Sequence, residues 1–235
     1  MGLPQIIINF RTAGSSAVRR SARGQAVLLA EGEKAELYSF SEAEQAESAG
    51  LAEDCRRLLR LCFLGGPAKV LLYRYPKGEE TAALARCAPA AEGGWLCAPQ
   101  MDAQTVTAFV KSKRAEGRPL RAVVSSETGP DCAGIVNLTT QGITVLLEGK
   151  TESVDTADYC ARIAGILAGL SLRESATYYP LPEVTGFVRS EDEEADIAAG
   201  RLILDQGSEG ARIARAVTSL TTLSQPGDSA FQKIK

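Results

Sequence analysis

The middle of this sequence alternates short apolar runs with amphipathic segments, and that alternation is its strongest constraint on the fold. Strands are expected at residues 69–75, 95–98, 120–125, 134–138 and 143–148. Helices are expected at residues 79–87, 102–114 and 155–172. Alternating strands and helices favour a parallel sheet with helices on its faces. We therefore predict an α/β fold, α+β overall, with a mostly parallel sheet flanked by helices.

The segments on either side of this region continue the pattern less regularly. Two further strands are expected at residues 24–30 and 34–40. Ser41 and Glu44 have the spacing of a capping box, which predicts a helix starting at Ser41. A second helix is expected from Leu51, with one apolar stripe. The stripe consists of Leu51, Cys55, Leu58, Leu59 and Cys62.

Two further features are expected in the later part of the chain, a turn and a pair of strands. Residues 178–182 contain two prolines and are expected to form a rigid, linker-like turn. Residues 202–204 and 211–217 are expected to form an antiparallel strand pair.

The predicted helix at residues 155–172 carries a row of small residues four apart. Ala161, Gly165 and Gly169 would let another element approach the helix backbone closely. Each glycine costs about 1 kcal/mol of helix stability relative to alanine, so close packing is the expected compensation. This favours packing within the core over a contact with another molecule.

The amino-acid composition excludes several classes of function. The 235 residues include no histidine, which removes Ser-His-Asp and Cys-His catalysis and histidine metal sites. The near balance of 26 basic and 29 acidic residues argues against a dedicated nucleic-acid binder, which would need a basic face for the phosphate backbone. The six cysteines form no CxxC pair, and we expect them to be buried, reduced and apolar in character.

No segment indicates export or a membrane span. The apolar run Ile6-Ile7-Ile8 is too short for a signal peptide, and arginines follow it. No apolar run approaches the roughly 20 residues of a membrane helix. We expect a protein of the cytosol that does not insert into membranes.

Two weak patterns for ligand binding are interpreted as ordinary loops. Gly149-Lys150-Thr151 is similar to the end of a phosphate loop, but Thr144 stands where an earlier glycine is required. Glu127 and Asp131 follow a central strand, where open α/β sheets place ligands, yet no basic partner or third ligand accompanies them. The sequence therefore predicts no catalytic, cofactor-binding or metal-binding residue.

The N-terminal residues have the character of an extended arm. Pro4 precedes a β-branched, apolar run that does not alternate with polar residues. Such a strand can add to the exposed sheet edge of a neighbouring subunit. The predicted subunit-contact residues are Gln5, Ile6, Ile7, Ile8, Asn9 and Phe10.

The order of segments resembles the tail sheath proteins of contractile bacteriophage tails and related particles. The matching segments are Gly2-Leu3-Pro4, Ala22-Arg23-Gly24, Phe63-Leu64-Gly65-Gly66-Pro67, Ala108-Phe109-Val110-Lys111 and Gly134-Ile135-Val136-Asn137, and, more specifically, residues 161–170, Tyr178-Tyr179-Pro180-Leu181-Pro182, Ser219-Leu220-Thr221-Thr222 and Phe231-Gln232-Lys233-Ile234-Lys235. The resemblance implies a structural subunit, with no enzymatic activity and no cofactor, that polymerises helically around a tail tube. Contraction of such a sleeve drives the tube through the host envelope.

The resemblance also implies partners, location and domains. The partners are neighbouring sheath subunits, the tail tube protein and the baseplate, without nucleic acid. The location is the host cytoplasm during assembly and then the virion tail. We expect a β-rich arm at residues 1–40, a non-catalytic core of subtilisin-like fold at 41–182, and the start of a C-terminal sheath domain at 183–235. Sheath proteins normally continue beyond this point, so we expect an incomplete C-terminal domain and only weak self-association.

Two other classes of function stay open at this stage. One is an α/β domain that binds a small molecule or acts as an enzyme, with its site near Glu127 and Asp131. The other is a different tail or baseplate component on the same scaffold.

Overall fold

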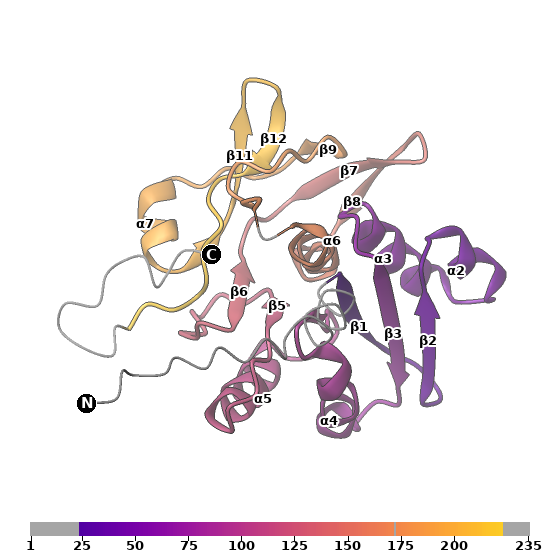
Figure 1. Cartoon of the computed structure of the whole chain (residues 1–235). Coiled ribbons are helices and arrows are strands. Elements are labelled where there is room, and N and C mark those ends of the chain that lie inside the picture. Colours follow the sequence, from indigo (N-terminus) through magenta and orange to yellow (C-terminus); the bar gives the residue numbers. More distant parts are fainter. Residues whose placement is uncertain (1–23, 172, 223–235) are drawn as a thin grey trace, which may run out of the picture.

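The computed structural model describes residues 24–171 and 173–222, and it is built around one large sheet (Figure 1). This sheet has seven strands in the order β10-β6-β5-β4-β1-β3-β2. Every adjacent pair is parallel except β2 with β3. Its strands are β1 (Gln25–Glu31), β2 (Glu36–Phe40), β3 (Lys69–Tyr75), β4 (Trp95–Cys97), β5 (Ala122–Val124), β6 (Ile135–Leu138) and β10 (Arg201–Leu202). The predicted fold class, a mostly parallel sheet flanked by helices, is confirmed.

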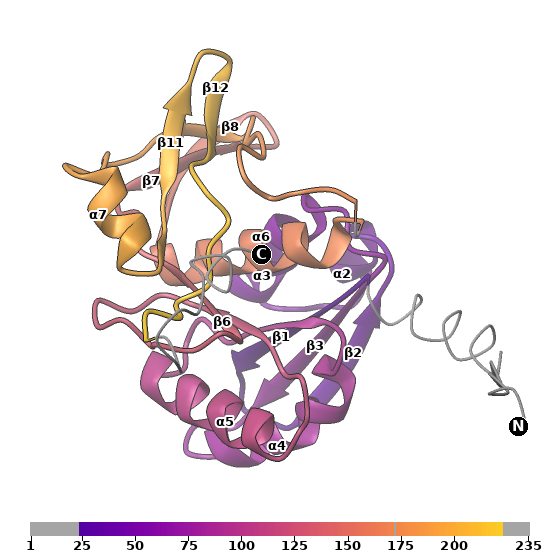
Figure 2. The ribbon, with the colours of Figure 1, turned by 60° about the vertical axis from the view of Figure 1, so that its left-hand side comes forward.

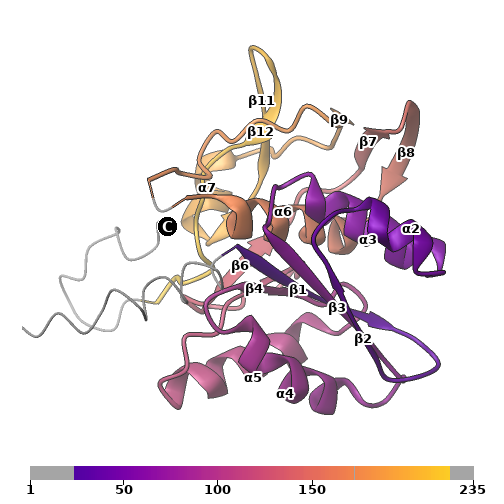
Figure 3. The same cartoon turned by 45° about the vertical axis from the view of Figure 1, so that its right-hand side comes forward.

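Helices cover both faces of this sheet. They are α2 (Glu44–Ser48), α3 (Glu53–Phe63), α4 (Glu80–Ala91), α5 (Ala103–Ala115), α6 (Thr156–Gly169) and α7 (Glu193–Ala198). Helices α3 and α6 pack on one face, and α4 and α5 pack on the other (Figures 1 and 3). The result is a three-layer core.

Alternate residues of the central strand β1 enter the two hydrophobic layers. Ala26 and Leu28 join the layer under α3 and α6, whereas Val27 and Leu29 join the layer under α4 and α5. All four side chains are fully buried. A strand covered on both faces needs a continuous apolar run, and that is why residues 24–30 read as a strand in the sequence.

A second layer of short strands covers the far side of α6 (Figure 2). Three of them form an antiparallel sheet in the order β8-β7-β9. They are β7 (Ile143–Leu147), β8 (Lys150–Val154) and β9 (Val184–Gly186). A separate hairpin pairs β11 (Leu204–Gly207) with β12 (Gly210–Ile213). Helix α6 is therefore enclosed between the large sheet and these strands.

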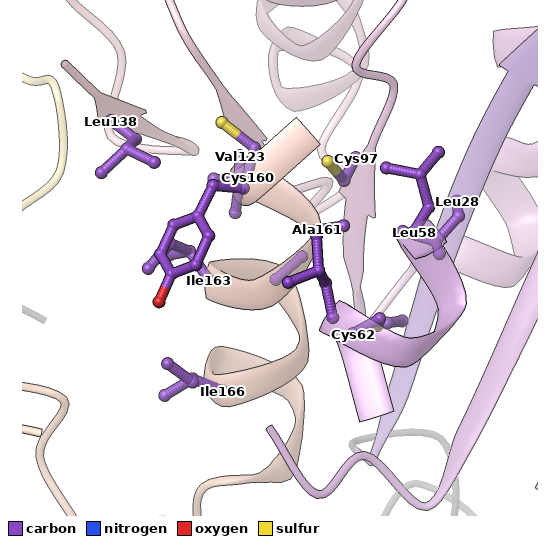
Figure 4. Packing of buried hydrophobic residues seen from close by; sticks show 14 of the residues in the cluster. Leu28, Leu58, Cys62, Cys97, Val123, Leu138, Cys160, Ala161, Ile163 and Ile166 are labelled. Atoms are coloured by element: carbon purple, nitrogen blue, oxygen red, sulfur yellow. The ribbon is translucent and has the colours of Figure 1, made fainter. Parts of the chain in front are cut away.

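Helices α3 and α6 approach until their backbones touch. A Cβ atom built on Gly165 would lie 2.0 Å from the carbonyl oxygen of Cys62. One built on Gly169 would lie 2.3 Å from the carbonyl oxygen of Gly65. Figure 4 shows residues of α6 beside Leu58 and Cys62 of α3. The row of small residues serves packing inside the chain, as the sequence favoured.

Most predicted elements are confirmed within a few residues, and two local predictions are wrong. Helix α2 begins at Glu44 with Ala43 before it, and Ser41 makes no side-chain cap. Instead, the Gln45 side chain accepts a hydrogen bond from the backbone N–H of Ser41 at 2.9 Å. Residues 178–182 are not a linker-like turn, because they run along β12 and Leu181 is fully buried.

The C-terminal strand pair exists with different bounds from those predicted. Leu204 pairs with Ile213 in the β11–β12 hairpin. Leu202 instead lies in β10, parallel to β6 of the large sheet. Strands from all three expected domains thus share this sheet, and the boundaries at 40 and 182 stay predictions.

Replacing Gly165 with alanine tests the backbone contact. Alanine favours a helix by about 1 kcal/mol, but its methyl group would overlap the Cys62 carbonyl. We expect Gly165→Ala to lower the free energy of unfolding by about 2 to 3 kcal/mol in urea titrations. Gly129→Ala is the control, because a Cβ there meets nothing closer than 3.9 Å. Equal stability of the two variants would contradict the contact.

Candidate functional site

The residues predicted to make the subunit contact, Gln5 to Phe10, lie outside the described residues. The second candidate from the sequence, Glu127 with Asp131, lies in the loop between β5 and β6. These two side chains have different surroundings in the structure. Only Asp131 is held by specific partners, and they come from the C-terminal segment.

Asp131 anchors the last described residues of the chain. Its Oδ1 accepts hydrogen bonds from the backbone N–H groups of Thr221 at 2.8 Å and Thr222 at 2.9 Å. Its Oδ2 accepts a hydrogen bond from the Thr222 hydroxyl at 2.6 Å. These bonds hold the pKa of Asp131 well below its ordinary value. The carboxylate is a structural clamp and is not available as a metal ligand.

Ser219 extends the same attachment. Its hydroxyl donates to the Cys132 carbonyl at 3.1 Å, and its backbone N–H donates to the Ile135 carbonyl at 2.8 Å. Ser219 is fully buried. The segment Ser219-Leu220-Thr221-Thr222, noted above only for its resemblance to a family, therefore closes the chain onto the loop before β6.

Glu127 borders a shallow polar cavity at the carboxyl ends of β5 and β6. Its other lining residues are Ser125, Ser126, Thr139, Gln141 and Arg201. Arg201 is already paired with Asp196 at 2.8 Å. The described residues bring together no group of three potential metal ligands here or elsewhere. The cavity has one free carboxylate and no nucleophile paired with a base.

The weak phosphate-loop pattern has a different explanation. Strands β7 and β8 form a hairpin, and Leu147 pairs with Lys150 across its turn. Glu148 and Gly149 supply the turn with φ angles of 51° and 78°. A two-residue turn with both φ angles positive is the standard tight hairpin connection. The sequence analysis missed β8, and the turn pair Glu148-Gly149 was the signal that could have revealed it.

The cysteines behave as predicted. All six are buried and form no disulfide. Burial raises the pKa of Cys62 to about 12 and that of Cys87 to about 11. Such thiols are poor nucleophiles at neutral pH.

A buried ion pair joins α6 to the small sheet. Arg162 Nε donates to Glu183 Oε1 at 2.7 Å, and the Tyr159 hydroxyl donates to the same oxygen at 2.7 Å. Burial lowers the pKa of Arg162, but its hydrogen bond to Glu183 and the charge of that carboxylate outweigh this effect and raise it. The Arg162 guanidinium also lies 5.8 Å from the centre of the Tyr179 ring.

The same residue, Glu183, fixes the sheet through its backbone. Its carbonyl accepts a hydrogen bond from the Leu146 N–H of β7 at 2.7 Å. Side chain and main chain of Glu183 thus connect α6, β7 and the segment that leads into β9. No sequence pattern pointed to this pair, because its members are 21 residues apart.

Among the described residues, the features suited to assembly are strand edges. The large sheet ends at β2 on one side and at β10 on the other, and the small sheet ends at β8 and β9. No helix of the described part is long and apolar enough to cross a membrane.

The sequence and the fold of this chain were compared with those of known proteins. No family model matches the chain. A tail sheath protein of Clostridium phage phiCD119 is 27% identical over an alignment of 247 positions, which covers 100% of this chain and 68% of that protein. This chain is a homologue of contractile tail sheath proteins. The relationship confirms the resemblance seen in the sequence and the expectation of a structural protein rather than an enzyme.

Solved structures share the fold at lower identity. The crystal structure of the sheath tail protein from Desulfitobacterium hafniense matches with a TM-score of 0.72 and 15% identity, over 97% of this chain and 78% of that one. The sheath tail protein Lin1278 from Listeria innocua matches with a TM-score of 0.72 and 16% identity, over 93% and 76% of the two chains. The contracted helical sheath of the anti-feeding prophage matches with a TM-score of 0.63 and 14% identity, over 97% and 70%.

Acid titration tests the Asp131 clamp. A folded-state pKa below the ordinary value of 3.8 means that the carboxylate stabilises the fold above that pH. This stabilisation begins to decrease as the pH falls below about 5 and is lost progressively toward the lowered folded-state pKa. We expect Asp131→Ala to lower the melting temperature at pH 7 and to flatten its decline between pH 5 and 3. Glu127→Ala, which removes a carboxylate from the same loop, should leave both unchanged; a parallel decline for Asp131→Ala and the native chain would argue against the clamp.

A double-mutant cycle tests the buried pair. Arg162→Met leaves the Glu183 carboxylate buried without its cation, so we expect a loss of about 3 to 5 kcal/mol in the free energy of unfolding. Arg162→Met combined with Glu183→Leu should be less destabilised than Arg162→Met alone. The half-exposed pair of Arg118 with Glu92 is the control, with less than about 1 kcal/mol expected. Additive effects at Arg162 and Glu183 would contradict their coupling.

Proposed function

We propose that this chain is a structural subunit of the sheath of a contractile phage tail or phage-like particle, polymerising helically and contracting to drive the tail tube through the host envelope. The observation that carries the proposal is the sequence relationship with a tail sheath protein along the whole of this chain. The shared fold with the anti-feeding prophage sheath supports it.

The proposal includes partners and a site of assembly. Neighbouring subunits are the first partner, and the tail tube and baseplate are the others. A match to a chain of the anti-feeding prophage baseplate structure, with a TM-score of 0.64, supports an association with the baseplate. Assembly would take place in the host cytoplasm, without nucleic acid or membrane insertion, and the product would be part of the virion tail. A tail-tube gene directly downstream would support a sheath subunit over another tail component.

The arm at Gln5 to Phe10 is proposed to link subunits by strand exchange. An apolar strand contributed to a neighbour's sheet gains main-chain hydrogen bonds and side-chain contacts. Because the donor and acceptor surfaces differ, the contact is heterologous and repeats into an open helix.

Deleting residues 1–12 tests this linkage. We expect the shortened chain to keep the circular dichroism spectrum and melting temperature of the parent. Its sedimentation coefficient should stay that of a monomer at concentrations where the parent associates. Equal association of the two chains would refute strand exchange by the arm.

A further inference from the structure

A cavity between α5 and the loop after β5 lies beside the point where the described chain ends. Helix α5 lies on the outside of the large sheet (Figure 2). The cavity has a volume of about 320 Å³, at the lower end of the range of about 300 to 1,000 Å³ for ligand pockets. One wall is the face of α5 that carries Ala103, Ala108 and Lys111, and the other wall includes Gly129 and Pro130 of the loop. The small side chains of these walls leave room for a short stretch of peptide.

The lining of the cavity suits an apolar occupant that carries one negative charge. Ala103 and Ala108 present methyl groups, and Lys111 is the charged residue of the lining. Lys113 on the same helix pairs with Glu116 at 2.9 Å, whereas the exposed Lys111 makes no ion pair with any other described residue. An acidic group in or beside the cavity would therefore find a cation that is still available.

The Asp131 clamp delivers the chain to the rim of this cavity. Asp131 accepts hydrogen bonds from the backbone N–H and the hydroxyl of both Thr221 and Thr222. Pro130, the residue directly before Asp131, lines the cavity. Residue 223 thus follows a residue that is fixed next to the cavity wall.

The composition of residues 223–235, which lie outside the described residues, matches this lining. Leu223 is apolar and comes directly after the clamp. Pro226-Gly227 has the residues preferred at the centre of a type II turn, which brings the first and fourth residues of the turn within about 7 Å of each other. The fourth residue is Asp228, the one acidic residue of this segment. A turn here would keep its carboxylate close to the clamp.

We propose that the cavity is the seat of residues 223–228 of the same chain, with Leu223 against Ala108 and Asp228 paired with Lys111. The seated segment would act as a strap that extends the Asp131 clamp across α5. It would fix the direction in which the chain leaves the core after the clamp. This inference is independent of a role in a sheath.

The polar cavity beside Glu127 is a less suitable seat, although its lining shares Ser126 with the first cavity. The free carboxylate of Glu127 would repel Asp228. Its walls also consist of polar side chains, which offer little to an apolar residue such as Leu223.

Disulfide trapping within one chain tests the seat. Ala108→Cys, at an exposed position of the α5 wall, is combined with Ser224→Cys or Gln225→Cys. The six native cysteines are buried, so they should not compete. A disulfide forms when two Cβ atoms come within about 4.5 Å. We expect at least one combination to close within the chain in dilute protein under mild oxidation, as measured by mass and gel mobility.

Ala85→Cys is the matched control, because Ala85 is an exposed alanine on α4, the helix that packs beside α5. We expect closure to be at least tenfold faster with Ala108→Cys than with Ala85→Cys. Equal rates would overturn the proposal, since the segment would then reach both helices without a preferred seat. Bonding that occurs only between two chains would assign the cavity to a second copy and overturn the seat in the same chain. No bonding at all would leave the cavity to another ligand and also overturn it.

A charge swap tests the pairing of Lys111 with Asp228. We expect Lys111→Glu to slow the closure with Ala108→Cys about threefold, because two carboxylates would then face each other. Combining Lys111→Glu with Asp228→Lys should restore the rate. Lys69→Glu, which changes an exposed lysine at the start of β3, should have no effect. Failure of the combined change to restore the rate would overturn the pairing.

Discussion

The contact between the backbones of α3 and α6 is the constraint on which the rest of the structure depends. Side chains of ordinary size would hold two helices 8 to 10 Å apart. Gly165 and Gly169 remove that spacing, so α6 lies against the Cys62 carbonyl and the glycine turn after α3. In this position α6 is buried on both sides, because one side packs on the large sheet and the other packs under the small strands.

Helix α6 is buried on both sides and connects the large sheet to the small strands. Its buried Arg162 pairs through Nε with Glu183, which in turn fixes β7, while the Nη1 atom of Arg162 has no hydrogen-bond partner among the described residues. Asp131 adds a second attachment by holding the C-terminal segment on the loop before β6. These two attachments hold α6, the small sheet and the C-terminal segment together in the described part of the chain.

The order of strands and helices could be predicted from the sequence because it depends on local periodicity. The apolar run of β1 and the apolar stripe of α3 each lie within one element. The local errors had local causes. At Ser41 a glutamine one residue beyond the expected partner reaches back, and at residues 178–182 two prolines hid an extended segment that pairs with β12.

The sequence by itself determined the fold class, the burial of the cysteines, the absence of histidine chemistry and the relationship to a family. Each of these depends on residue types and on spacing along one element. Only the tertiary structure decided that Asp131 is a clamp, that Arg162 meets Glu183, and that β2 is the outermost strand of the large sheet among the described residues. Those facts depend on residues 21 to 91 positions apart meeting in space and on the order of the described strands in the sheet, and neither leaves a periodic signal in the chain.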